Sequence, residues 1–217
     1  MYALILLMVF MFLVYQHSRL SERQVAVIPR RIGSRLGQLW TIAHHGMREN
    51  RLLRAEKALL TILKIDEKNA AAYNRLGILY AKQREYRDAI DCFEIASSIE
   101  PSASSLHNLG LIYYETENYQ KSATAFEQAL KLEDSLAARH VAYAKVQEKL
   151  GNDKLMFQQL QKALELEPTV ESYNLLINAY ESRGFSDEAK ALKNKLNKLA
   201  TKSSQQRHLS RPRRVVI

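Results

Sequence analysis

Histidine and cysteine side chains are the ones best suited to catalysis or metal binding, and this 217-residue chain has six histidines and one cysteine. His44 and His45 are adjacent, so on a helix their side chains point about 100° apart. His107 and His140 each stand alone in the sequence. The chain has no nucleophile–base constellation, no glycine-rich phosphate loop and no metal-ligand spacing. We therefore expect a protein that is not an enzyme and that holds neither a metal ion nor a cofactor.

The single cysteine, Cys92, lies beside Phe93 in an apolar pattern with helical spacing. One cysteine excludes an intramolecular disulfide bond. A cysteine in such a pattern behaves as a small hydrophobic residue. We expect Cys92 to be a structural thiol.

The net charge of +9 is concentrated at the two ends of the chain. Residues 16–54 hold eight arginines against Glu22 and Glu49, and residues 201–217 hold five Lys or Arg and no acid. The body between them is nearly neutral. This distribution favours contact with a membrane surface, or flexible basic arms, over a groove that follows nucleic-acid phosphates.

A repeated pattern of large and small residues organises the middle of the chain. Between Ala70 and Pro101 it comprises Tyr73, Leu76, Gly77, Tyr80, Tyr86, Ala89, Phe93 and Ala96. The pair Leu109-Gly110 lies 33 residues after Leu76-Gly77, and Tyr113, Tyr119, Phe126 and Ala129 follow it in step. This spacing resembles the tetratricopeptide repeat (TPR), a helix–turn–helix of about 34 residues.

The resemblance implies an all-α TPR solenoid over residues 36–200, a right-handed superhelix of about five helix pairs. A degenerate first pair precedes the unit 70–101, and further units cover 103–136, 137–169 and 170–200. In this pattern Gly or Ala lets paired helices approach closely, Gly151 and Gly184 turn the chain, and Pro101 and Pro168 end helices. The lysine-rich last helix suits the end of an open stack.

In TPR proteins the first helix of each pair lines a concave groove that takes an extended peptide or a partner helix. By register, the resemblance places these residues in the groove: Trp40, His44, Asn74, Ile78, His107, Leu111, Tyr114, Val141, Lys145, Asn174 and Asn178. One TPR subclass grips the carboxylate of chaperone tails with Lys, Asn and Arg at set positions. Of these positions only Asn108 matches here, so we do not expect a chaperone-tail receptor.

The first residues, MYALILLMVFMFLV, contain no charge. We interpret residues 1–17 as a short transmembrane anchor, slightly below the usual length of about 20 residues. A cleaved signal peptide and a buried helix are the alternatives, but no Lys or Arg precedes the apolar run and no A-x-A-like site follows it. The arginines of a basic linker at 18–35 place the following domain on the cytoplasmic side and attract anionic lipid.

Residues 201–217 are polar and basic until the final Val-Val-Ile, and we expect a disordered tail. Alternatives for it are a lipid-binding or RNA-binding arm, or a peptide that another protein captures.

The layout of anchor and repeats looks like that of the lipopolysaccharide assembly protein B family. That family also ends in a cysteine-rich metal-binding module, for which this chain has no counterpart. We therefore expect a single-pass, membrane-anchored TPR adaptor that binds partner proteins through its groove. An organelle-surface import or chaperone-type receptor, or a nucleic-acid-binding protein using the basic tail, are the alternatives.

Overall fold

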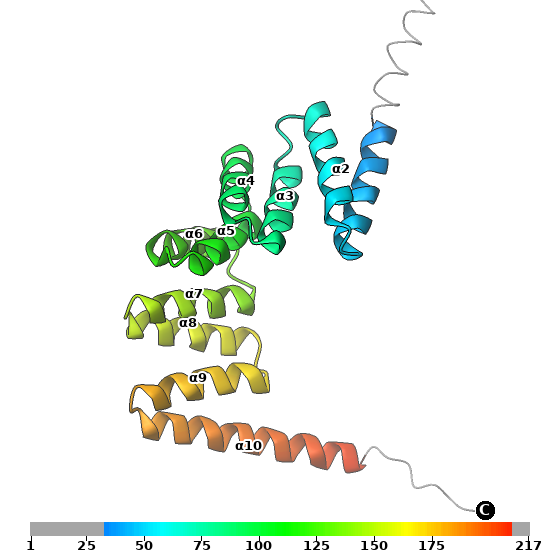
Figure 1. The fold of residues 1–217 in the computed structure, drawn as a ribbon. Helices are drawn as coiled ribbons and strands as arrows, with labels where there is room; N and C mark the ends of the chain where they lie inside the picture. Colours follow the sequence, from blue (N-terminus) through cyan, green and yellow to red (C-terminus); the bar gives the residue numbers. More distant parts are fainter. Residues whose placement is uncertain (1–32, 210–217) are drawn as a thin grey trace, which may run out of the picture.

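The structure is a computed structural model that describes residues 33–209. Within this range it is entirely α-helical and contains ten helices. A helix over residues 33–48 is followed by α2 (Leu52–Ile65), α3 (Ala70–Gln83), α4 (Tyr86–Ile99), α5 (Ala103–Glu115), α6 (Tyr119–Leu132), α7 (Ala137–Lys149), α8 (Asp153–Leu166), α9 (Val170–Ser182) and α10 (Ser186–Leu209). Figure 1 shows them as five helix pairs stacked along a curved axis, which confirms the predicted solenoid.

Side-chain caps start several of the first helices of the pairs. The Asn69 side chain accepts a hydrogen bond from the Ala72 N–H at 2.9 Å, and Ser102 does the same for the third residue after it. At α9, Thr169 and Ser172 cap each other's backbone in a capping box. Such caps satisfy N–H groups that have no partner within the helix, so the sequence defines where each pair begins.

A residue in the left-handed backbone conformation turns the chain inside every pair. Gly151 and Gly184 have φ of 74° and 80°, as the sequence predicted, and Asn50, Arg84 and Glu117 occupy the corresponding turns at 58°, 64° and 60°. The same turn therefore recurs in all five helix pairs, although glycine occupies the left-handed position in only two of them. Residues with a side chain adopt this conformation at a cost that glycine does not have.

Prolines follow two of the second helices, again as predicted. Helix α4 ends at Ile99, before Pro101, and α8 ends at Leu166, before Pro168. Proline lacks the N–H that would continue a helix, so each second helix stops and the next pair can begin.

A glycine and a phenylalanine bring the two helices of a pair together. A Cβ atom placed on Gly77 of α3 would lie 2.6 Å from the Phe93 ring of α4, and one on Gly110 of α5 would lie 2.9 Å from the Phe126 ring of α6. Both rings are fully buried. The absence of a side chain at these glycines therefore sets the distance between the helices, as the repeat pattern predicted.

The hydrophobic core runs as a series of clusters along the stack rather than gathering at one centre. The first cluster joins the helix 33–48, α2 and α3, and the later ones each join helices from adjacent pairs. Helices contact mainly their neighbours in the chain, with additional contacts from α3 to α5 and from α5 to α7. The first helices of successive pairs thus form a continuous row.

The predicted anchor and linker lie wholly or largely outside the residues that the structure describes. The predicted anchor, residues 1–17, lies outside the described residues, and among the helices that are described none is long and apolar enough to cross a membrane. The helix 33–48 already includes the last three residues of the predicted linker 18–35.

At the other end, α10 continues to Leu209, past the predicted boundary of the tail at residue 201. This corrects the prediction of a disordered segment for residues 201–209. The reason lies in composition, since residues 186–209 are mostly Lys, Leu, Ala, Gln and Ser and contain neither glycine nor proline.

Candidate functional site

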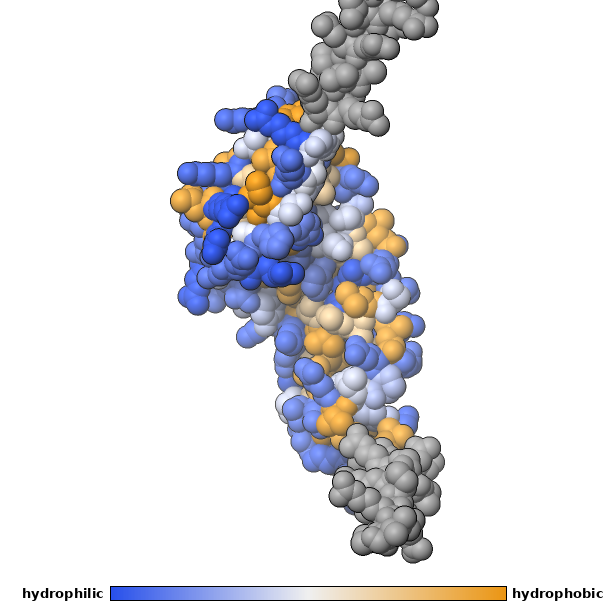
Figure 2. Space-filling model, turned by 90° about the vertical axis from the view of Figure 1, so that its right-hand side faces the viewer, coloured by the Kyte–Doolittle hydropathy of each residue, from blue (hydrophilic) through white to orange (hydrophobic). Residues whose placement is uncertain are grey.

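The candidate site is the surface formed by the row of first helices, residues 33–48, α3, α5, α7 and α9. In Figure 1 the stack curves so that the helix 33–48 and the carboxyl-terminal end of α10 both lie to the right of α6. Figure 2 views that side and shows apolar side chains scattered among polar ones along the whole length of the molecule. Within the row, the Asn108 side chain of α5 donates a hydrogen bond of 3.3 Å to the Asn74 side chain of α3.

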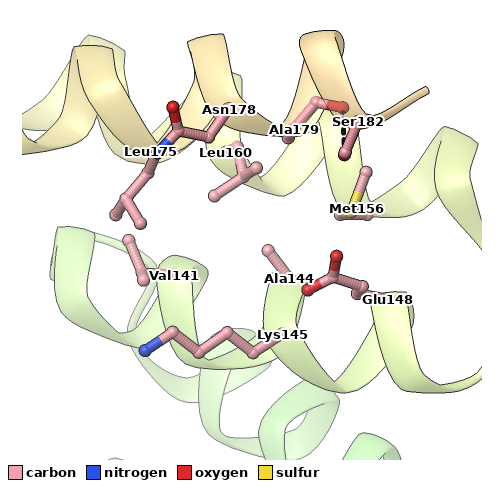
Figure 3. Close-up of a pocket in the computed structure, with 10 residues that line it drawn as sticks. All are labelled: Val141, Ala144, Lys145, Glu148, Met156, Leu160, Leu175, Asn178, Ala179 and Ser182. Atoms are coloured by element: carbon pink, nitrogen blue, oxygen red, sulfur yellow. Dashed lines mark hydrogen bonds between the residues drawn. The ribbon is translucent and has the colours of Figure 1, made fainter. Parts of the chain in front are cut away.

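A cavity of about 290 Å³ opens on this surface between α7 and α9. Val141 of α7 and Leu175 of α9 face each other across it, and Leu160 and Met156 of α8 add to its apolar lining (Figure 3). Lys145 and Asn178 add polar groups to its lining. Three residues predicted for the groove, Val141, Lys145 and Asn178, therefore meet at one cavity.

We call this hollow the α7–α9 cavity, and one residue of its lining, Glu148, belongs to an ion-pair cluster. The Arg183 guanidinium, after α9, lies 3.6 Å from the Glu148 carboxylate of α7 and 2.9 Å from the Asp153 carboxylate of α8. It links three helices at the edge of the cavity, so the acidic Glu148 is already partnered.

A second cavity, of about 410 Å³, lies between the helix 33–48 and α3, and we call it the amino-terminal cavity. Its lining is basic and apolar and comprises His44, His45, Met47, Arg48, Arg75, Ile78 and Lys82. Two residues predicted for the groove, His44 and Ile78, meet here. The carboxylate of Glu49, which follows the helix 33–48 in the chain, lies 3.9 Å from His45 and 3.4 Å from Arg51.

Other residues predicted for the groove have different surroundings. His107 packs edge-on against the Phe126 ring at 5.4 Å, and burial together with the nearby Arg139 charge lowers its pKa. It therefore lies between helices, where packing is its evident role. Trp40 packs against the first core cluster, with its ring 6.1 Å from that of His44.

The remaining predicted positions belong to neither cavity. Tyr114 is half-buried, with its ring 5.6 Å from that of Tyr119. Leu111 and Asn174 are exposed, while Asn74 is half-buried and bonded to Asn108. Groove and packing positions are adjacent on a helix, so register alone does not separate the two.

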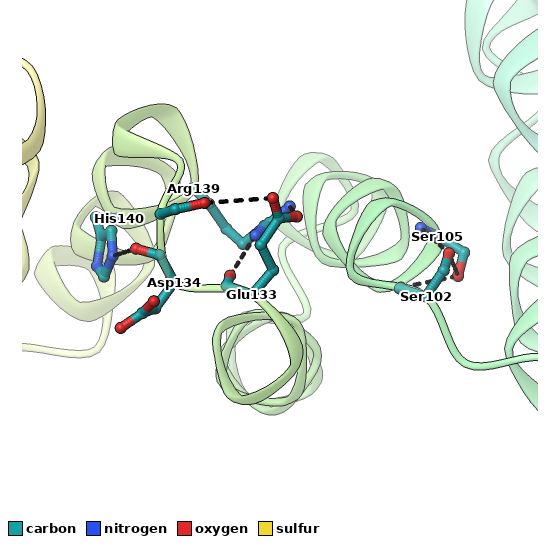
Figure 4. A network of polar contacts seen from close by, with 7 residues as sticks. Ser102, Ser105, Glu133, Asp134, Arg139 and His140 are labelled. Carbon is teal, nitrogen blue, oxygen red and sulfur yellow. Dashed lines mark hydrogen bonds and ion pairs between the residues drawn. The ribbon is translucent and has the colours of Figure 1, made fainter.

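A polar network that sequence reasoning did not predict lies at the junction of α6 and α7 (Figure 4). Arg139 is 2% exposed, and its guanidinium donates to the Glu133 carbonyl and lies 3.1 Å from the Glu133 carboxylate. His140 bonds the Gln159 side chain at 2.7 Å and the Asp134 carbonyl at 2.8 Å. The one available signal was Asp134, which stands where the repeat pattern expects proline.

The described residues offer no centre for metal or thiol chemistry. Nowhere in residues 33–199 do three His, Cys, Asp or Glu side chains gather in a way that could hold a metal ion. Burial, followed by the charges of Asp88 and Asp91, raises the pKa of the Cys92 thiol to about 11. A thiol with so high a pKa is a poor nucleophile at neutral pH.

Comparison with known families agrees with the repeat geometry. A sequence profile of the tetratricopeptide repeat matches residues 70–102, and a longer one matches residues 101–167. The chain contains tetratricopeptide repeats. These matches cover the second, third and fourth helix pairs, where the glycine–phenylalanine contacts and the α7–α8 packing lie. A search of curated proteins finds no match.

Solved structures of other proteins share the fold. A crystal structure of MamA superimposes with a TM-score of 0.71 at 21% identity, over 80% of this chain and 96% of that one. MamA from Desulfovibrio magneticus RS-1 gives 0.69 at 14% identity, over 77% and 96%. YrrB, described as a TPR protein with an unusual peptide-binding site, gives 0.61 at 19% identity, over 70% and 80%. The solenoid is thus shared by these chains.

Proposed function

We propose that this protein is a membrane-anchored TPR adaptor that binds an extended segment of a partner protein along its row of first helices. The bound partner is thereby held at the membrane, where the protein organises a complex. The observation that carries the proposal is the α7–α9 cavity, where Val141, Lys145 and Asn178 converge from two different repeats.

The chemistry of that cavity suits a peptide. Its apolar residues, Val141, Leu160, Leu175 and Met156, offer a place for an apolar side chain. The Asn178 amide can both donate and accept, so it can bond a peptide backbone in either sense. YrrB supports this reading, since it is a TPR protein described as having a peptide-binding site.

Attachment to a membrane rests on the sequence of the first 17 residues and on the arginines that follow them. The uncharged run MYALILLMVFMFLV is followed by Arg19, Arg23, Arg30, Arg31 and Arg35. The positive-inside rule then assigns the repeats to the cytoplasmic side. If this is right, the full chain resists alkaline extraction from membranes, and deletion of residues 1–17 releases it.

The binding surface is tested by crosslinking and pulldown of the full chain from native membranes. The test variant is Lys145→Ala with Asn178→Ala, both on exposed positions of the α7–α9 cavity. The matched control is Lys154→Ala with Gln158→Ala, two exposed residues of α8 that do not line the cavity. Both pairs remove one lysine and one amide.

A partner recovered by the wild-type chain and the control but depleted in the test variant supports the adaptor function. Equal recovery by all three proteins would mean that this cavity is not the binding surface. Circular dichroism verifies that both variants keep the helical content of the wild type.

A further inference from the structure

We propose that the amino-terminal cavity binds an acidic segment of the partner protein, one in which carboxylates flank an apolar side chain. This inference rests on the proposed function and specifies the chemistry of the partner. It concerns Arg48, Arg75 and Lys82 together with the apolar Met47 and Ile78, which line the cavity from two different repeats.

The first observation is that the cations of the cavity have no acidic partner. Among the described residues, the side chains of Arg48, Arg75 and Lys82 form neither an ion pair nor a hydrogen bond. Arg51, which lies outside the cavity, is by contrast paired with Glu49. Three unpaired positive charges around one hollow create a local potential that attracts carboxylates.

The second observation is the lack of acids on the helices that form the cavity. Neither the helix 33–48 nor α3 contains a single Asp or Glu. The later first helices do contain acids, with Glu148 on α7 and Glu171 and Glu181 on α9. The deepest blue in Figure 2, which marks the most hydrophilic residues, gathers on the upper, amino-terminal part of this face. The row is therefore asymmetric, basic at one end and mixed at the other.

The third observation is the apolar component. Met47 is buried and Ile78 is half-buried, and both line the same hollow as the cations. A polyphosphate or a lipid headgroup has no apolar group to place against Met47 and Ile78. An apolar side chain between carboxylates, by contrast, matches both the apolar and the basic part of the lining. The cations are also confined to one end of the row, so they do not form the continuous track that a nucleic-acid backbone requires.

This cavity differs from the chaperone-tail clamp of other TPR proteins. Asn74 and Ile78 stand where that clamp needs Lys and Asn. The cations here are instead placed at Arg48, Arg75 and Lys82, so we expect recognition of internal acidic side chains rather than of a terminal carboxylate.

The test is fluorescence anisotropy with the full chain in a neutral detergent and a short labelled peptide. The acidic probe has Glu and Asp on both sides of a central Leu, with its carboxyl terminus amidated. The comparison probe replaces every Glu and Asp by Gln and Asn. The variant Arg75→Gln with Lys82→Gln is matched by Arg54→Gln with Lys57→Gln, exposed residues of α2 outside the cavity that give the same change in net charge.

We expect the acidic probe to bind more tightly than the amide probe. Each cation removed from the cavity weakens binding by about fivefold, the upper end for a solvent-exposed ion pair. The control variant retains wild-type affinity, and higher salt weakens binding of the acidic probe to the wild-type chain.

Equal affinity for the two probes, or equal loss in both variants, overturns the inference. It is also overturned if the cavity variant reduces binding of the full chain to phosphatidylserine vesicles, relative to the control, while the affinity for the acidic peptide is unchanged. Partner recovery that depends on Lys145 and Asn178 would in either case leave the proposed function standing.

Discussion

Replacing Gly77 by alanine tests whether the close packing of α3 against α4 depends on the glycine–phenylalanine contact within the repeat. The added Cβ would lie 2.6 Å from the nearest carbon of the Phe93 ring, whereas carbon atoms pack favourably at about 3.5–4.0 Å. Phe93 is 1% exposed, so its ring cannot move without displacing other core residues. Overpacking of this kind costs about 1–3 kcal/mol.

The same substitution also improves helix propensity by about 1 kcal/mol, because α3 is helical at residue 77. The large overlap with Phe93 places the packing cost near the top of its range. We therefore expect a net loss of about 2 kcal/mol in the free energy of unfolding.

Gly37→Ala is the matched control, since Gly37 also lies in a helix but has no atom within 4 Å of its would-be Cβ. Only the propensity gain remains there, so stability should rise by up to about 1 kcal/mol. One chemical change thus has opposite signs at two helical positions, and the sign depends on the neighbouring phenylalanine.

Urea unfolding followed by circular dichroism at equilibrium measures both effects. A second variant, Gly77→Ala with Phe93→Leu, adds a coupling test. The smaller leucine side chain should relieve part of the overlap with the methyl group added at residue 77. The double variant should therefore lose less free energy of unfolding than the two single substitutions lose together. A Gly77→Ala protein as stable as the Gly37→Ala protein would refute the packing explanation.

Four further outcomes are expected. Arg139→Ala should lower the free energy of unfolding by about 3 kcal/mol, because the substitution leaves a buried site empty and removes the bonds to Glu133. In the same urea assay, Lys154→Ala at an exposed site should change the free energy of unfolding little. Cys92 should react with a disulfide reagent at pH 8 about a hundredfold more slowly in the folded chain than in urea, since its pKa is raised to about 11, and equal rates would contradict this burial. The pKa of the Cys92 thiol is higher in the folded chain than in the unfolded chain, so ionisation of this thiol favours unfolding. The free energy of unfolding should therefore be unaffected by this group below about pH 8.5 and should fall as the pH rises towards 11. Urea midpoints measured over this pH range would reveal the loss. Gly151→Ala should cost about 1–2 kcal/mol through its φ of 74°, and a thermal melting temperature equal to that of the wild type would be inconsistent with this strain.

Local sequence rules account for most of the solenoid. The spacing of Gly77 to Phe93 and of Gly110 to Phe126 predicts two helices that touch, and the structure places each glycine against its phenylalanine. The turns at Gly151 and Gly184 were likewise predictable, because glycine is the residue that most readily adopts positive φ.

The side of the helix on which a residue lies is harder to predict. His107, which register predicts for the groove, is half-buried and packs edge-on against Phe126. Its neighbour in space, Arg139, could not be predicted to be buried, because charged residues are rarely enclosed without a partner and its partner Glu133 lies in a loop. Both positions depend on how α7 docks onto the preceding pair, which is a property of the assembled stack.

The candidate site shows the same division. Register places Val141, Lys145 and Asn178 on first helices with the repeat period, and all three line the α7–α9 cavity. For the amino-terminal cavity, register predicted His44 and Ile78 but not its cations. Arg48, Arg75 and Lys82 belong to two repeats and converge only when the helices pack.

The contacts of this fold are mostly between helices that are adjacent in the chain, with a few between successive first helices. A small rotation at each junction therefore adds to the next along the stack, while every helix keeps its own hydrogen bonds. The protein should behave as an elastic element whose curvature opens or tightens under load. A force applied between the two ends of the stack would then stretch the solenoid before any single repeat unfolds.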